Sequence, residues 1–491
     1  MKYIMILSII FFFTNNLVFA QNIRSFTIHS QEDETIESGL ELQSNKYLFI
    51  TRHGTFSDTL EMSWWGIYGY NSRLYVSDSN LNIEDSIDLL IPGYYTIAYK
   101  IQIIRDTVII LGRAIKTDLS EEHIFFSSFT KDLSNIQTDI IGIQGNYELF
   151  FDADTNSKGQ IVITAISNNF PSSHHNLFIV TNNKKELISY IADTASTGYV
   201  RIHYNTSSNT YHLINAQSVS FYDTNFCKIE EKDFPFKNRF FNQYYLMPVD
   251  DFSYTLQGIG FFKRKNRDSG LDISYYLVDT GFSVIDSNYI YLPDSLDNAG
   301  GMDFKTTDSI FMGGTYNTNW GGSFPPQFQH ENHKLVLQCS NLYTDDIYWT
   351  TKFAGNGNYL MKNVFVTSAN QCIVMATYYN WQSNPVQERD IVLFKIDDNG
   401  MVTTTNLKNN HKFNFNVYPN PGKNRINIKN NTSSNFTYYF RLINIKGNIV
   451  AEQKLIGSST IVNINFLPKG TYTYTISDNY NIFESGVWIK E

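Results

Sequence analysis

Short runs in which apolar and polar residues alternate recur along most of the chain. Side chains of a strand point in turn to its two faces, so each run predicts a β-strand with one face in a core. Each run ends at a polar residue that can begin a tight turn. The runs are 74–78, 128–132, 178–182, 220–223, 276–279, 336–340 and 394–397, and their last residues are Asp78, Asp132, Asn182, Asp223, Asp279, Ser340 and Asp397.

A second apolar strand precedes each of those turns. Several of these strands end in glycine or another small residue, as at Gly112 and Gly313. We expect these strands at residues 47–52, 108–114, 161–166, 211–216, 254–259, 310–315 and 373–378.

The pair of strands repeats with a period of about 53 residues, which leaves room for about four strands in each copy. Sheets of this size are typical of β-propellers, where each sheet covers the apolar face of the next. We therefore predict an all-β protein with a β-propeller of roughly seven blades over residues 21–407. A pair of β-sandwiches or a right-handed β-solenoid is the alternative, although solenoid coils repeat at a much shorter period.

The pattern changes after a polar linker at residues 408–412. The sequence Tyr418-Pro419-Asn420-Pro421 precedes an alternating strand, and its two prolines stiffen a turn and exclude a helix. A strand pair with glycine at its turn, a second hairpin and a short last strand follow. The residues that mark these later elements are Gly447, Leu467, Pro468, Gly470, Tyr472 and Lys490. This order predicts a separate small β-domain over residues 413–491.

These successive motifs resemble the type A C-terminal sorting domain of the type IX secretion system, which is found in Bacteroidetes. The resemblance implies an immunoglobulin-like β-sandwich that the outer-membrane export machinery reads, and that is then typically clipped off. The family's motif residues correspond here to Tyr418, Pro419, Asn420, Pro421, Gly447, Leu467, Pro468, Gly470, Tyr472 and Lys490. The resemblance implies that they act in sorting and folding, not in catalysis.

The first 20 residues have the pattern of a secretory signal peptide. Lys2 supplies the positive start, an apolar run follows, and a small-residue cleavage site ends at Ala20. No later stretch reaches the roughly 18 apolar residues that a membrane helix needs, so we expect no membrane span. Together with the tail, this predicts a protein that is secreted or held at the outer cell surface, by way of the periplasm.

Composition supports strands and excludes some partners. Aromatic residues make up 15% of the chain, and charged residues only 17%. Aromatic side chains favour strands. A net charge of -9 without a basic cluster predicts that the chain does not bind nucleic acid. The three cysteines, Cys227, Cys339 and Cys372, are too scattered for a disulfide framework or a zinc site, so we expect three buried thiols, with a Cys339–Cys372 bridge as the alternative.

Candidate chemistry is sparse. The triplet Arg52-His53-Gly54 is similar to the phosphate-binding triplet of histidine phosphatases, but those enzymes need an α/β fold, so we interpret it as a chance match. The pair His174-His175 fits a surface loop. We found no nucleophile elbow, phosphate-binding loop or dinucleotide fingerprint, and we predict no catalytic, cofactor-binding or metal-binding residue.

Two acidic segments look like calcium loops. Asp152, Asp154 and Asn156 alternate before Gly159, but Ile163 stands where a calcium loop has its closing carboxylate. The segment 294–303 has a similar acidic turn. We expect ordinary turns and no cofactor, with calcium as a weak alternative.

Three functions fit these observations. The first is a non-enzymatic binding or adhesion module that holds a carbohydrate or protein on a propeller face. The tryptophans Trp64, Trp65, Trp320 and Trp381 could stack on sugar rings there, although blade packing uses aromatic residues equally well. The second is a polysaccharide hydrolase or lyase, because glycosidase carboxylates have no fixed local spacing. The third is a structural component of an extracellular matrix or gliding surface.

Overall fold

The computed structural model divides the chain into two compact units, unit 1 at residues 1–405 and unit 2 at residues 406–491. The structure describes residues 26–28, 33–43, 46–54, 70–142, 147–167, 175–182, 186–193, 201–215, 218–233, 245–250, 253–261, 271–290, 292, 296–318, 333–344, 346–353, 358–379, 389–402, 415–430, 438–444, 449–455, 457–477 and 482–491. The expected signal peptide and the linker lie outside the described residues, as do His174, Gly447 and the four tryptophans named above.

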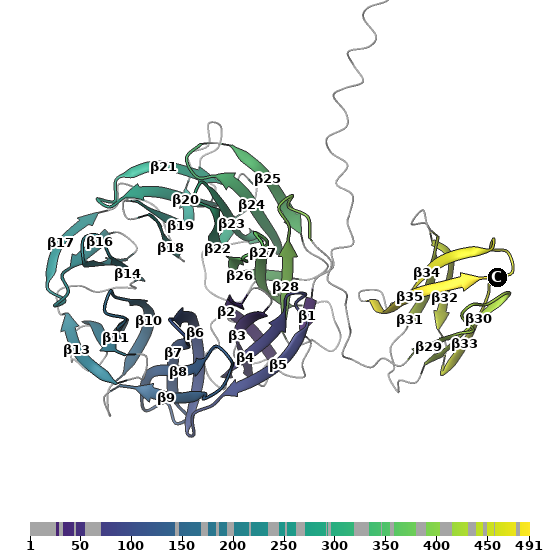
Figure 1. Cartoon of the computed structure of the whole chain (residues 1–491), viewed down its shortest axis with the longest axis horizontal. Coiled ribbons are helices and arrows are strands. Elements are labelled where there is room, and N and C mark those ends of the chain that lie inside the picture. Colours follow the sequence, from purple (N-terminus) through teal and green to yellow (C-terminus); the bar gives the residue numbers. More distant parts are fainter. Residues whose placement is uncertain are drawn as a thin grey trace, which may run out of the picture. The chain divides into compact units, whose positions relative to one another are not determined.

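Unit 1 is built from four-stranded antiparallel sheets arranged as a ring (Figure 1). Sheet 1 is β2 (Asp33–Gln43), β3 (Lys46–Gly54), β4 (Tyr70–Asp78) and β5 (Ile83–Leu89); sheet 2 is β6 (Tyr94–Ile104), β7 (Thr107–Lys116), β8 (Glu122–Thr130) and β9 (Gln137–Ile141); sheet 3 is β10 (Glu148–Thr155), β11 (Ile161–Ser167), β12 (His175–Thr181) and β13 (Leu187–Asp193); sheet 4 is β14 (Arg201–Asn205), β15 (Thr210–Ile214), β16 (Ser218–Tyr222) and β17 (Lys228–Asp233).

Three more sheets complete the described part of the ring. Sheet 5 is β18 (Tyr245–Asp250), β19 (Ser253–Phe261), β20 (Leu271–Asp279) and β21 (Val284–Tyr289); sheet 6 is β22 (Leu296–Thr306), β23 (Ser309–Thr318), β24 (Lys334–Asn341) and β25 (Ile347–Phe353); sheet 7 is β26 (Asn358–Val366), β27 (Cys372–Tyr379), β28 (Asp390–Ile396) and β1 (Phe26–Ile28). The all-β propeller prediction is confirmed. The apolar strand that we expected before each turn is the second strand of its sheet, from β3 to β27.

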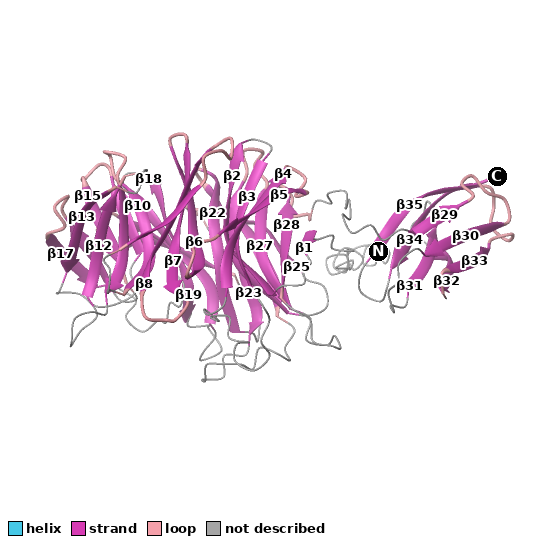
Figure 2. Cartoon of the chain, turned by 90° about the horizontal axis from the view of Figure 1, so that it is seen from below, coloured by secondary structure: helices cyan, strands magenta, loops and turns pink. Residues whose placement is uncertain are grey.

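The ring closes through strands from both ends of unit 1. β1 pairs with β28 in antiparallel register, and Phe26 lies opposite Leu393. Figure 2 shows the strands of the ring running between its two faces. Apolar clusters fill the seams between neighbouring sheets; one, for example, joins Leu74 of sheet 1 to Val108 and Phe125 of sheet 2. Burial of these faces is the main stabilising contribution, at about 25 cal/mol per Å².

A repeated turn joins the third and fourth strands of several sheets. In one of these turns, the Phe282 amide donates a hydrogen bond to the Asp279 carbonyl at 2.9 Å. The Ser283 amide donates to the Asp279 carboxylate at 2.8 Å. Phe282 has a φ of 58°, and the corresponding Leu81 has a φ of 64°. A left-handed backbone costs an L residue about 1–2 kcal/mol. Burial offsets this cost, because Leu81 is 2% and Phe282 3% exposed, and each packs on the preceding sheet.

The same turn corrects one prediction about the cysteines. Cys339 and Cys372 are buried free thiols in the seam between sheets 6 and 7, and burial raises the pKa of Cys339 to about 11. Cys227 is free but exposed, so the expectation of three buried thiols is wrong. Phe226 takes the inward position of the turn, with a φ of 61°, and the next residue therefore faces outward.

Unit 2 packs two antiparallel sheets around one apolar core. One sheet has the order β29 (Phe415–Tyr418), β30 (Arg425–Asn430) and β33 (Ser459–Asn463); the other has the order β32 (Ile449–Leu455), β31 (Tyr438–Ile443), β34 (Gly470–Ser477) and β35 (Ile482–Lys490). Trp488 is fully buried in this core. No helix in the described part of either unit is long and apolar enough to cross a membrane.

Candidate functional sites

The proline-rich turn of unit 2 is fastened to the last strand of the chain. The Trp488 indole Nε1 donates to the Pro419 carbonyl at 2.8 Å, and the Ile489 amide donates to Asn420 Oδ1 at 3.0 Å. Gly422 continues the contact, because its amide donates to the Ile489 carbonyl at 2.9 Å. The first and last predicted motifs of the tail therefore form one substructure.

Lys490 connects that substructure to the hairpin that begins near Leu467. Its Nζ, on a residue that is 7% exposed, donates to the Ile464 carbonyl at 2.6 Å and to the Asn465 carbonyl at 3.3 Å. Tyr472 Oη donates to the Pro468 carbonyl at 2.8 Å, which holds the hairpin. The structure thus brings Pro419 and Asn420 of the proline-rich turn against the last strand, which contains Lys490. Leu467, Pro468 and Tyr472 belong to the hairpin that Lys490 contacts.

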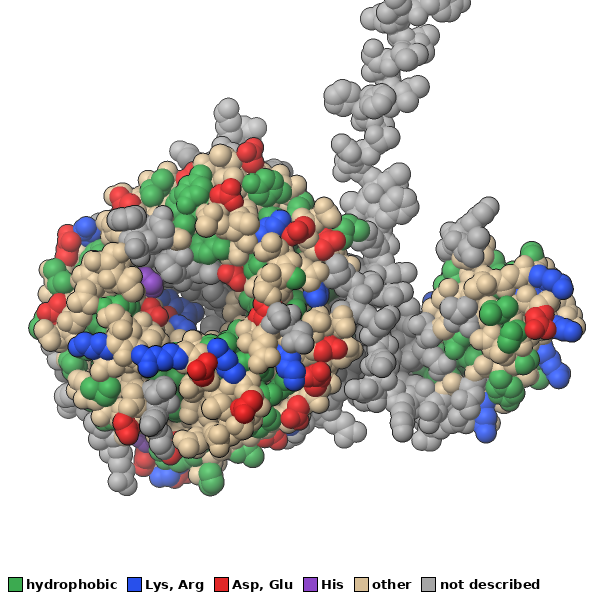
Figure 3. Space-filling model, in the orientation of Figure 1, with side chains coloured by type: hydrophobic (Ala, Val, Ile, Leu, Met, Phe, Trp, Pro, Cys, Tyr) green, Lys and Arg blue, Asp and Glu red, His purple; other side chains and the backbone are tan. Residues whose placement is uncertain are grey.

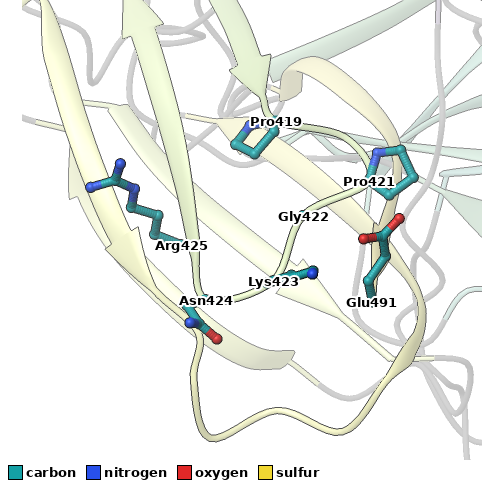
Figure 4. Close-up of a pocket in the computed structure, with 7 residues that line it drawn as sticks. All are labelled: Pro419, Pro421, Gly422, Lys423, Asn424, Arg425 and Glu491. Carbon is teal, nitrogen blue, oxygen red and sulfur yellow. The ribbon is translucent and has the colours of Figure 1, made fainter.

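A shallow hollow of about 530 Å³ lies beside the proline-rich turn (Figure 4). Pro419 and Pro421 line it, together with Lys423, Arg425 and the terminal residue Glu491. Lys423, Arg425 and Glu491 lie outside the predicted motif, so sequence reasoning missed them. Their only signal was their position directly after the motif and at the end of the last strand.

Unit 1 holds a charged cluster on the first two strands of sheet 1 and the first strand of sheet 7. Arg52 of β3 lies 2.7 Å from Glu37 of β2, measured from Nη2 to Oε1, and Lys362 Nζ of β26 lies 3.9 Å from the same Oε1. The side chains of Arg52, Glu37 and Lys362 are 7%, 8% and 14% exposed. The cluster joins sheets 7 and 1. Figure 3 shows the hollow at the centre of the ring, with side chains of both charges near it.

The third sheet of this region contributes an aromatic ring. The Arg52 guanidinium lies over the Tyr99 ring of β6, 4.9 Å from its centroid. A cation over an aromatic face is held by the ring quadrupole, so the stacking fixes the guanidinium plane. Burial lowers the pKa of Lys362, and the nearby cations Arg52 and Arg389 lower it further, while Glu37 acts in the opposite direction.

Other acidic groups in unit 1 are also engaged by cations. Lys100 Nζ lies 2.8 Å from Asp152 Oδ1, and Arg113 pairs with Glu122. Arg73 contacts Glu34 at 3.2 Å. The Asp33 carboxylate is fully buried and receives the Arg389 guanidinium, whose Nε lies 2.9 Å and 3.0 Å from the two carboxylate oxygens.

Two side chains at the seams have shifted pKa values. Burial raises the pKa of Asp303 to about 6. Two backbone amides that donate to its carboxylate, Val366 at 2.6 Å and Phe304 at 2.8 Å, lower the pKa but do not outweigh burial. His123 Nδ1 lies 2.6 Å from Glu148 Oε2, and this hydrogen bond is the main cause that raises the pKa of His123. Each of the two groups is built into a seam between neighbouring sheets.

The structure assigns positions to the remaining sequence candidates. Asp152 and Asp154 lie on β10, where their oxygens accept the Ile202 amide at 3.2 Å and the Tyr204 amide at 2.7 Å of β14. His175 begins β12, and Asp297 lies on β22. The Arg52-His53-Gly54 triplet ends β3. Its first residue, Arg52, which we interpreted as part of a chance match, belongs to the buried charged cluster. Within the described ranges, no group of three His, Cys, Asp or Glu residues is arranged to hold a metal ion.

Comparison with known proteins identifies the tail. Residues 416–490 match the family model of the secretion system C-terminal sorting domain. The resemblance to a type IX sorting domain is therefore confirmed, and the tail marks the chain for export to the cell surface or beyond it. No curated protein sequence matches the chain.

Solved structures similar to unit 1 include β-propellers. The β-propeller domain of the Trilobed protease from Pyrococcus furiosus is 10% identical, with a TM-score of 0.42 over 77% of this chain and 99% of that one. The GH74 enzyme of Niastella koreensis is 10% identical, with a TM-score of 0.44 over 82% of this chain and 59% of that one. An α-L-arabinanase of Penicillium chrysogenum, complexed with arabinobiose, is 10% identical, with a TM-score of 0.39 over 77% of this chain and 100% of that one. Similarity at this level concerns the fold alone.

Proposed function

We propose that this exported protein is a non-enzymatic binding or adhesion module, with a carbohydrate or protein as the ligand of its propeller. One observation carries the proposal: the described carboxylates around the cluster are already held by cations. Glu37 is held by Arg52, Asp33 by Arg389 and Asp152 by Lys100. A carboxylate whose oxygens are engaged by an adjacent cation is not free to protonate a leaving group, whereas paired charges on rigid strands suit recognition.

A polysaccharide hydrolase or lyase is the second candidate. A glycosidase needs a carboxyl group that stays protonated near neutral pH, and the raised pKa of Asp303 is such a feature. Both Asp303 oxygens, however, accept backbone amides of its own sheet and of sheet 7. These bonds give Asp303 a role in joining two sheets.

Binding and hydrolysis can be tested together. The purified mature chain should be retained on a glycan or protein array, and should release no reducing sugar from the polysaccharides that retain it. Asp303→Asn, which keeps the side-chain shape, should leave both results unchanged. Release of reducing ends by the unmodified chain and its loss in Asp303→Asn would favour the hydrolase. Absence of retention on every surface would contradict the binding module.

The route of export gives a second test. In a bacterium with a type IX system, the full chain should reach the cell surface or the medium, and a chain that ends at residue 405 should stay in the periplasm. Mass spectrometry of the ends should find Gln21 as the first residue if the expected signal peptide is removed there. Equal release of the two chains would show that unit 2 does not direct sorting.

A further inference from the structure

The outer face of the three-stranded sheet of unit 2 has an apolar row across its middle. Tyr418 of β29 lies opposite Asn427 of β30, and Asn427 lies opposite Ile461 of β33. Ile426 and Val462, one position away, pack in the core, so the side chains of the row point to the opposite face. Tyr418 is 47% and Ile461 59% exposed. Two large side chains with apolar surface therefore lie on the outside of one small sheet.

Two cations flank this row. Arg425 and Lys429 stand two positions before and two positions after Asn427 on β30, so their side chains belong to the same outer face. Both residues are exposed, and neither makes an ion pair with a described residue. The strands β29, β30 and β33 contain no Asp or Glu. The face thus has an uncompensated positive charge on each side of an apolar centre.

The other sheet of unit 2 has a compensated charge. Its Arg441 Nε lies 2.6 Å from Glu452 Oε2. Glu491 ends the chain on the side of the hollow opposite Arg425 (Figure 4). Residues 413–491 have eight Lys and Arg and four Asp and Glu, whereas in the whole chain 47 acidic residues exceed 38 basic ones. Figure 3 shows more basic than acidic side chains on the face of unit 2 that it presents.

Burial does not explain Tyr418 as it explains other large side chains of the tail motif. Leu467, Tyr472 and Lys490 are 8%, 6% and 7% exposed. Tyr472 and Lys490 also donate the hydrogen bonds that hold the hairpin and the last strand. Tyr418 has nearly half of its surface in solvent, so its ring can contact another molecule.

We propose that this face of unit 2 binds an acidic protein surface of the export machinery. Arg425 and Lys429 pair with carboxylates of the partner, and Tyr418 and Ile461 pack on its apolar side chains. The family match shows that the tail marks the chain for export. The inference adds the face that is recognised and the charge of the partner. It goes beyond the binding function proposed for unit 1 and does not depend on it.

The apolar row favours a protein partner over an anionic membrane or an acidic polysaccharide. A protein interface has an apolar centre and a polar rim, which is the arrangement of this face. At an anionic membrane the two cations would contribute only about 2 kcal/mol. Three strands of at most six residues cover about 300 Å², well below the roughly 800 Å² that each partner buries in a standard complex. We therefore expect a transient complex, as a signal that is passed on requires.

The chemistry of the partner is tested with acidic probes and the full mature chain, by isothermal titration calorimetry. A random copolymer of glutamate and tyrosine is the protein-like probe, and poly-L-glutamate lacks the apolar part. Polygalacturonate and vesicles of phosphatidylglycerol represent the polysaccharide and the membrane. We expect the copolymer to bind about threefold or more tightly than poly-L-glutamate, and sodium chloride to weaken both. Tighter binding of polygalacturonate or of the vesicles would overturn the protein partner.

Variants connect binding to the face. Arg425→Glu with Lys429→Glu should weaken copolymer binding about tenfold or more. Lys454→Glu with Lys469→Glu is the matched control, because it makes the same change of charge at exposed residues outside the three-stranded sheet. Ile461→Thr should weaken binding of the copolymer but not of poly-L-glutamate. Equal losses in the two double variants would overturn the proposal, since net charge alone would then explain binding.

Export in a bacterium with a type IX system is the decisive readout. The Arg425→Glu, Lys429→Glu chain should stay in the periplasm, with surface and medium levels about tenfold lower, while the control variant is exported like the unmodified chain. Arg425→Gln with Lys429→Gln repeats the test with a milder change, and circular dichroism confirms that each chain is folded. Normal export of the folded variants would overturn the proposal. Retention of purified chains on the array does not involve this face, so that outcome would leave the binding function of unit 1 unaffected.

Discussion

The seam between sheets 7 and 1 has a buried ion pair beside its apolar core, whereas the described contacts of the seam between sheets 4 and 5 are aromatic. In the first, Asp33 accepts the Arg389 guanidinium, the Arg389 amide at 2.8 Å and the Tyr70 hydroxyl at 2.6 Å. In the second, the described contacts are aromatic, since Phe282 of sheet 5 meets Phe221 at 5.9 Å and His212 at 6.1 Å between ring centroids.

The difference follows the path of the chain. Sheets 4 and 5 are consecutive in sequence, and an aromatic contact without strict direction is enough to seat one on the other. Sheets 7 and 1 come from opposite ends of unit 1. Because no short connection fixes their alignment, the correct one must be selected from many possible alignments. A carboxylate that receives a guanidinium and two further donors has one good geometry, and we infer that it specifies the register of closure.

The largest expected effect comes from breaking the polar seam. Arg389→Met leaves the fully buried Asp33 without its cation, and should lower the free energy of unfolding by about 3–5 kcal/mol. Urea unfolding followed by tryptophan fluorescence measures it. Lys46→Met, in an exposed pair with Glu84, should cost less than about 1 kcal/mol. Equal losses in the two variants would show that the buried pair has no special role.

Opening the aromatic seam should cost somewhat less. Phe282→Ala removes a ring that is 3% exposed, and we expect a loss of about 3 kcal/mol in the same urea experiment. Phe282→Gly should lose about 1 kcal/mol less, because glycine accepts the φ of 58° without strain. A glycine variant that is less stable than the alanine variant would contradict the strain that we assign to this turn.

Acid should weaken the aromatic seam specifically. Burial lowers the pKa of His212 to about 4, with contributions from His203 and Lys232. Because the folded pKa lies below the unfolded value of about 6.5, this group's contribution is complete above pH 6.5 and is lost as the pH falls toward 4. We expect about 2 kcal/mol less stability at pH 5 than at pH 8 from this group. His212→Leu should remove that part of the pH dependence of the free energy of unfolding. If the pH dependence is unchanged in this variant, it arises from groups other than His212.

The smallest effect belongs to a single neutral bond in the polar seam. Thr377 Oγ1 of β27 accepts the Ile36 amide of β2 at 3.4 Å. Thr377→Val keeps the shape and removes the acceptor, so we expect a loss of about 1 kcal/mol. Thermal unfolding of Thr377→Val beside Thr377→Ser, which keeps the hydroxyl, separates the bond from the packing. A serine variant as destabilised as the valine variant would assign the loss to packing.

The sequence was most informative where the physics is local. The second strand of each sheet and the turns that follow Asp78, Asp223 and Asp279 depend on residues close together in the chain, and both appear where the alternation predicts them. The tail motifs were also readable, because Pro419 and Pro421 restrict their own backbone.

Long-range contacts were not readable. Nothing in the three residues of β1 shows that they pair with β28. Leu81 and Phe282 sit in left-handed turns where glycine or asparagine is usual, because their side chains pack on the preceding sheet. The cluster around Arg52 depends on bulges in three strands, and a one-residue shift in pairing leaves no periodic signal.

The pairing of β1 with β28 also sets an order in time. A ribosome makes the chain from its first residue to its last, so Phe26 exists long before its partner Leu393. Sheets 1 to 6 can each form as soon as their own strands have been made, but sheet 7 must wait for the end of unit 1. Until β28 has been made, sheet 7 therefore lacks its third strand and the ring cannot be closed.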